Sequence, residues 1–210
     1  MAGLLLAGCG GAGDSDGSTD TEANGSATGS ASAESSSAVQ FVLPETCSEL
    51  LSLDAIDAGL GVRITGTTQY VVGVPEPEIG RTGRVTCSYG VIPNPDGTSS
   101  APLAQASVFT YDSVGSALDR VETVVSQGRS AGNRMQDVPV GNYDGVVIIS
   151  VTEATLIVAV ENRNYAITLA PGLVADDRLA PALASLAESA INGGQPVPTS
   201  DPTATPTRTT

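Results

Sequence analysis

The side chains that could do chemistry in this 210-residue chain form a short inventory. There is no His and no Lys, and all nine basic residues are Arg. These absences exclude a Ser-His-Asp triad, a Cys-His dyad, a His-ligated zinc site, a Walker A loop and a Schiff base. The 23 Asp and Glu side chains leave a net charge of −14, which repels phosphate backbones and argues against a nucleic-acid partner. Carboxylates, hydroxyls and three cysteines remain: Cys9, Cys47 and Cys87.

The first cysteine follows a short apolar run and two small residues. This segment, Leu6–Cys9, resembles the lipobox at the end of a bacterial lipoprotein signal peptide. The resemblance implies that residues 1–8, a truncated signal peptide, are removed. Cys9 then carries a diacylglyceryl group, whose two acyl chains, such as palmitate, anchor durably where one chain is marginal. Only Leu4–Leu6 are strongly apolar and no Arg precedes them, so either the true start lies upstream of Met1 or the resemblance is accidental. The expected location is the extracytoplasmic face of the cell membrane, with the lipid bilayer as a partner.

Composition divides the rest of the chain into three parts. Residues 9–39 begin with the lipidated Cys and continue in Gly, Ser, Ala, Thr and acid, a composition typical of a disordered linker. Residues 40–193 have enough apolar side chains for one hydrophobic core. Residues 194–210 form a Pro/Thr-rich tail that we expect to be disordered, and O-glycosylation of this tail remains open.

The hydrophobic pattern of the domain mixes helix and strand periods. It predicts strands over 62–73, 84–92, 103–111, 145–151, 154–160 and 165–169. Helices are expected over 47–51 and 53–58, from Ser113 to Gly128, and up to Asn192. The third helix carries a stripe predicted to be buried: Val114, Leu118, Val121 and Val125. Because tight turns rather than helical crossovers join most strands, the fold class is α+β: an antiparallel sheet packed by about three helices.

Cys47 and Cys87 remain once Cys9 is assigned to the lipid. An exported domain with one remaining pair is expected to oxidise it, which would join the first helix to the sheet. Closing a loop of about 40 residues contributes roughly 4 kcal/mol in the chain-entropy model. A catalytic redox pair is disfavoured because the C-x-x-C spacing is missing.

A family resemblance follows from the surroundings of these cysteines. Cys47 is followed by Leu50-Leu51, the helix ends near Gly59–Gly61, and a later strand carries Cys87-Ser88-Tyr89. Over roughly residues 45–92 this arrangement resembles small actinobacterial secreted lipoproteins of unknown function. The resemblance implies an exported domain and brings no catalytic motif with it.

Two classes of function remain open. The preferred one is a non-catalytic binding or accessory module of the cell envelope, without cofactor or metal, with Tyr143 as a candidate contact residue. Its partner would be an envelope protein if the domain has a flat polar surface and an exposed edge strand, or a small or lipidic ligand if it has an apolar pocket between sheet and helices. The alternatives are a purely structural envelope protein and a carboxylate-based hydrolase. A hydrolase requires converging carboxylates, for which Asp54 with Asp57, or Glu153 with Glu161, are the candidates.

Overall fold

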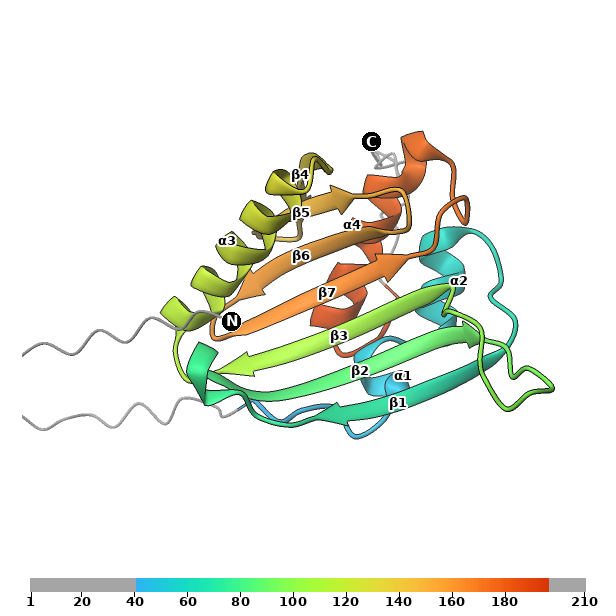
Figure 1. The fold of residues 1–210 in the computed structure, drawn as a ribbon, viewed down its shortest axis with the longest axis horizontal. Coiled ribbons are helices and arrows are strands. Elements are labelled where there is room, and N and C mark those ends of the chain that lie inside the picture. The colour runs from blue at the N-terminus through green and yellow to red at the C-terminus, as the bar shows by residue number, and fades with distance from the viewer. Residues whose placement is uncertain (1–40, 197–210) are drawn as a thin grey trace, which may run out of the picture. The chain divides into compact units, whose positions relative to one another are not determined.

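The computed structural model describes residues 41–196, so Cys9, the signal segment, the linker up to residue 40 and the tail from residue 197 lie outside the described residues. The helices are α1 (Cys47–Leu50), α2 (Leu53–Leu60), α3 (Val114–Ser130) and α4 (Asp176–Ile191), with a 3-10 turn η1 (Pro77–Ile79). The strands are β1 (Thr67–Gly73), β2 (Arg81–Val91), β3 (Ala104–Tyr111), β4 (Arg134–Val140), β5 (Tyr143–Ile149), β6 (Ala154–Val160) and β7 (Arg163–Leu169). Figure 1 shows their arrangement.

The seven strands form one antiparallel sheet in the order β1-β2-β3-β7-β6-β5-β4. Two hairpin-linked groups meet where β3 pairs with β7. After β3 the chain runs through α3 to the far edge of the sheet and returns strand by strand from β4 to β7 (Figure 1). The predicted α+β class with an antiparallel sheet is confirmed.

One face of the sheet is covered by α1, α2 and α4, which lie behind the strands in Figure 1. Directly paired residues share a face. A buried row crosses four strands on this covered face: Val85, Val108, Tyr165 and Val158. Leu183 and Leu186 of α4 complete the core against it. Helices α2 and α4 approach closely at Gly59, where an added Cβ would lie 2.7 Å from a methyl group of Leu186.

Among residues 41–196, the opposite face, which we call the open face, carries only α3, and this helix packs against the β4–β7 side of the sheet. The Asn164 amide of β7 donates to the carbonyl of Ala117 at 2.9 Å. The predicted buried stripe of α3 is wrong at its start, since Val114 and Leu118 are 51% and 54% exposed. Ala117 is the one residue of α3 that is fully buried. The first turns of the helix therefore contact the sheet through a small residue, whereas Val121, Val124 and Val125 further along are half-buried.

The structure agrees with the sequence pattern at the starts of two helices and differs from it in the bounds of two strands. Ser52 caps α2 by accepting from Ala55 N at 3.1 Å, and Ser113 caps α3 in the same way. The first strand begins at Thr67 rather than residue 62, and β4 was not predicted as a separate range. Pro181, a residue type that is normally tolerated only in a first helical turn, is the sixth residue of α4.

Candidate functional site

The two cysteines of the domain form a disulfide on the covered face. Cys47 and Cys87 are joined with a Cα–Cα distance of 5.6 Å. Next to this bond the Tyr89 hydroxyl donates to the carbonyl of Leu51 at 2.6 Å. Burial raises the pKa of Tyr89. The disulfide thus holds the α1 segment against β2, as expected, and its surroundings are those of a structural bond.

Tyr143, the predicted contact residue, is the first residue of β5 and is 37% exposed. It lies two residues before Gly145, which pairs with Val158, so its side chain belongs to the covered face. The structure brings Tyr143 together with neither the disulfide nor the open face. Its role as a contact residue stays a prediction.

The candidate carboxylates do not converge. Glu153 and Glu161 flank the two ends of β6, a strand of seven residues, which separates them by roughly 25 Å. On α2, the Asp57 carboxylate accepts a hydrogen bond from the guanidinium of Arg63 at 3.1 Å. One carboxylate of the Asp54/Asp57 pair is therefore already engaged in an ion pair. Within residues 41–196, no three Asp, Glu or Cys side chains are grouped so as to hold a metal ion.

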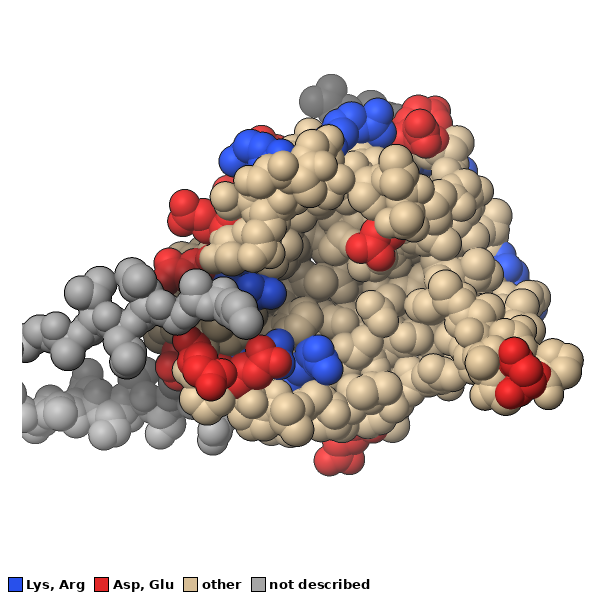
Figure 2. All heavy atoms as spheres, in the orientation of Figure 1, with Lys and Arg blue, Asp and Glu red and all other residues tan. Residues whose placement is uncertain are grey.

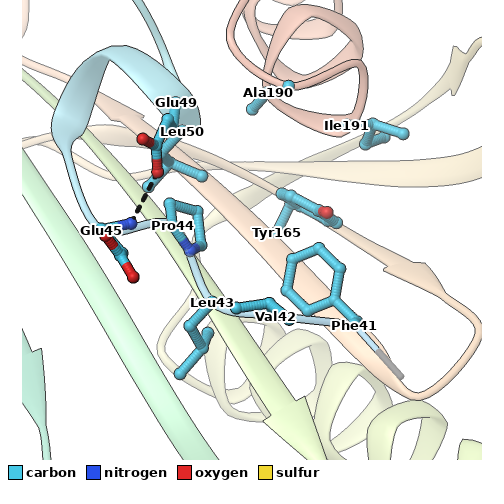
Figure 3. Close-up of a pocket in the computed structure, with 11 residues that line it drawn as sticks. Phe41, Val42, Leu43, Pro44, Glu45, Glu49, Leu50, Tyr165, Ala190 and Ile191 are labelled. Atoms are coloured by element: carbon cyan, nitrogen blue, oxygen red, sulfur yellow. Dashed lines mark hydrogen bonds between the residues drawn. The ribbon is translucent and has the colours of Figure 1, made fainter. Parts of the chain in front are cut away.

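An apolar groove of about 390 Å³ lies on the covered side, next to the first described residues. Figure 3 shows Phe41, Leu50, Tyr165 and Ile191 around it. The Arg163 guanidinium lies 4.4 Å from the centroid of the Phe41 ring, which fastens this end of the chain to β7. Burial raises the pKa of Tyr165. The groove is at the small end of the range for ligand pockets.

The open face presents a different surface. In Figure 2 the area between α3 and the β1 edge is hollowed, and most of its atoms are uncharged. The hydroxyl and amide side chains of this area, here called the polar patch, come from four strands: Thr86, Ser88, Gln105, Ser107, Thr155 and Thr168. They bond one another in cross-strand pairs, Thr86 with Ser107 at 2.9 Å and Gln105 with Ser88 at 3.1 Å. Thr155 and Thr168 pair likewise at 2.9 Å.

Arginines lie at one end of the polar patch, where β2 begins, and blue atoms gather there in Figure 2. Arg81 is buried, pairs with Glu76 and stacks 5.9 Å from the centre of the Phe109 ring. Arg84 is the direct neighbour of Phe109 across the strands. Its guanidinium lies over Gly73 of β1, where an added Cβ would collide with it.

Arg84 differs from Arg81 in having no acidic partner among residues 41–196. Its Nε is enclosed and has no hydrogen-bond partner in that part of the chain. An unpaired, half-buried cation is costly, and in an acidic protein it marks a place that attracts a negative or strongly polar group. Sequence reasoning missed Arg84 because the polar side of an alternating strand reads as ordinary solvent-facing surface. The sequence does contain a signal. Arg84, Thr86 and Ser88 alternate with Val85, Cys87 and Tyr89, so the three polar side chains share the opposite face of the strand.

Comparisons of the chain with protein-family models, with curated proteins and with solved structures found no match. None of the helices within residues 41–196 combines the length and the apolar character needed to cross a bilayer.

Proposed function

We propose that this protein is a non-catalytic binding module anchored at the extracytoplasmic face of the cell membrane by acylated Cys9. Leu6–Cys9 supports the anchor, and the Cys47–Cys87 bond is of the kind expected in an oxidising compartment. The domain presents its open face to an envelope protein.

The observation that carries this proposal is the half-covered sheet. An antiparallel sheet with one packed face normally exposes polar side chains on the other. Here the exposed area is also hollowed beside α3 and holds Arg84, which has no acidic partner among residues 41–196. Because the neighbouring Arg81 is already paired with Glu76, Arg84 is the cation to which a complementary partner would present carboxylates.

A protein partner fits better than a lipidic one. The apolar groove beside Phe41 is small and bordered by the chain's own segment 41–45. The polar patch, in contrast, is broad and adjoins β1, an exposed edge strand. These are the features expected of a surface that binds another protein.

The anchor is tested by replacing Cys9 with Ser. In the native host, the wild-type chain should incorporate an alkyne-labelled palmitate and sediment with membranes. The Cys9→Ser variant should lose the label and become extractable without detergent. Membrane association unchanged by Cys9→Ser would contradict the anchor.

The binding surface is tested by a photo-crosslinking amino acid placed at Ser88, within the polar patch, or at Glu122, exposed on α3. We expect a defined protein adduct from position 88 and none from position 122. Arg84→Gln should reduce that adduct several-fold, because it removes the unpaired cation. Arg134→Gln, which removes an exposed arginine of β4, is the matched control and should leave the adduct unchanged. Equal adducts from both positions, or equal effects of the two Arg variants, would contradict the proposed surface.

A further inference from the structure

The β1 edge of the sheet is unusually accessible. Its seven residues, Thr67–Gly73, carry no charge, and six of them are exposed. Val71 and Val72 are 49% and 61% exposed. A long, uncharged edge strand presents unpaired backbone groups and is a template for a further strand.

The other edge is protected. Strand β4 carries Arg134, Asp137 and Pro139 within seven residues. Charges and proline are the features that keep natural edge strands from pairing. Within residues 41–196 the same sheet therefore blocks one edge and leaves the other exposed, in a chain whose net charge of −14 otherwise opposes association.

The register of β1 suggests what would pair with it. A shift between Thr67 and Gln69 disturbs the start of the strand, and Gln69–Gly73 pair regularly with β2. The midpoint of that regular segment is Val71. Two antiparallel copies related by a two-fold axis at Val71 would place Val71 opposite itself and Tyr70 opposite Val72. Aromatic and β-branched side chains are favourable cross-strand pairs.

The same register brings a neutral hydrogen-bond acceptor to Arg84 and leaves its charge for the proposed partner. Gly73, over which the Arg84 guanidinium lies, would stand opposite Gln69 of the second copy. Gln69 and Arg84 both belong to the open face, since Gln69 pairs with Ser88 and Gly73 with Arg84. Adjacent strands are about 4.8 Å apart, so the Gln69 amide oxygen comes within reach of the unpaired donors of Arg84.

We propose that two copies of this chain associate by antiparallel pairing of their β1 strands, centred on Val71. A two-fold axis perpendicular to the sheet keeps both open faces on the same side. In one copy α3 borders the polar patch on one side only, and the surface ends at β1. In the pair, the second α3 borders the far side, so that two polar patches form one groove. The role of that groove in binding a partner depends on the proposed function, whereas the pairing of the two β1 strands does not.

The test uses the full-length Cys9→Ser chain, whose mass is measured by light scattering during size exclusion. Loading is raised to about 100 µM, above the micromolar range of weak interfaces. We expect twice the 21.0 kDa of one chain. Val71→Lys places two like charges directly opposite each other and should weaken the dimer at least about tenfold. Thr68→Lys is the matched control on the same strand, because its two lysines would be roughly 20 Å apart, and it should have little effect.

Three further measurements fix the partner and the register. A mixture of the Val71→Lys and Val71→Glu chains should dimerise where each alone does not, which also shows that both are folded. Val71→Cys should form a disulfide-linked dimer and Thr68→Cys should not. Gln69→Glu should tighten the dimer several-fold, and Arg84→Gln should abolish that gain.

A chain that stays at 21.0 kDa throughout the range would overturn the proposal. So would a dimer equally sensitive to Val71→Lys and Thr68→Lys, or to neither. A single-copy chain that still gives the Ser88 adduct would refute the pairing and leave the binding function standing. A dimer that gives no Ser88 adduct would support the pairing and refute the binding function.

Discussion

Neighbouring residues of the same strands serve opposite purposes on the two faces of the sheet. Val85 and Val108, paired on the covered face, are fully buried beneath the helices. One position along, Thr86 and Ser107 are paired on the open face, and their hydroxyls bond each other. The covered face holds the domain together, and the open face carries hydroxyls that pair with each other, of which Thr86 is half-buried and Ser107 buried. If this division is real, substitutions on the first should change stability and substitutions on the second should change binding.

The largest expected effect comes from the disulfide of the covered face. The bond closes a loop of 40 residues, and the double variant Cys47→Ser/Cys87→Ser should lose about 4 kcal/mol of unfolding free energy. Urea unfolding of the wild type and the double variant, followed by circular dichroism, measures the difference. A loss below about 1 kcal/mol would mean that the reduced chain is already held together by its core.

A pair of glycine substitutions compares the helices of the two faces. Gly59→Ala should destabilise the domain by about 1–3 kcal/mol, because the new Cβ would collide with Leu186. Gly115→Ala, on the exposed start of α3, meets nothing closer than 3.8 Å and should stabilise by about 0.5–1 kcal/mol. The measurement is the change in melting temperature, which should be a decrease for Gly59→Ala and an increase for Gly115→Ala. Two changes of the same sign would contradict it.

Alkaline pH should act on the domain through its buried tyrosines, of which Tyr89 and Tyr165 lie on the covered face and Tyr111 on the open face. Burial raises the pKa of Tyr89, Tyr111 and Tyr165 above the ordinary value of 10.0. Below pH 10 these groups are neutral in both folded and unfolded chains, so their stability contribution is intact. Above pH 10 the unfolded chain ionises first, and stability falls by up to about 1.4 kcal/mol per pH unit for each tyrosine.

The alkaline loss can be assigned by titrating unfolding free energies between pH 8 and about 11. Tyr89→Phe removes one ionising group and should flatten the decline, while lowering stability at pH 8 because the bond to Leu51 O is lost. A decline equally steep in wild type and Tyr89→Phe would exclude Tyr89 as a source.

The two faces also differ in how far the sequence predicts them. The covered face is strongly determined, since Val85, Cys87 and Tyr89 alternate with polar residues and an isolated pair of cysteines predicts a bond. Tyr89 and Tyr165, the largest fully buried side chains, lie on this face. Alternation says which side of a strand is apolar and nothing about whether a helix covers the other side.

The position of α3 shows why the rest was not predictable. A period of 3.6 marks Val114 and Leu118 as a buried stripe, yet the helix docks through Ala117. The docking is determined by partners distant in sequence, such as Asn164, which bonds the carbonyl of Ala117. Likewise β4, with Arg134, Asp137 and Pro139, has a poor strand composition and forms by pairing with β5. The placement of Arg84 over Gly73 needs the β1–β2 register, which no local pattern contains.

The smallest expected effect on stability lies in the polar patch, where the effect on binding should be largest. The double variant Thr86→Ala/Ser107→Ala removes both partners of one cross-strand hydrogen bond and leaves no unsatisfied group behind. Its unfolding free energy should therefore stay within about 0.5 kcal/mol of wild type. The adduct formed from the photo-crosslinker at Ser88 should fall several-fold, because the hydroxyls that face the partner are gone. Val85→Ala, one position away on the covered face, should show the reverse, a loss of about 1–3 kcal/mol with the adduct retained among the folded molecules. If both variants change stability and binding together, the two faces are not separable, because binding then depends on the same packing that folds the domain.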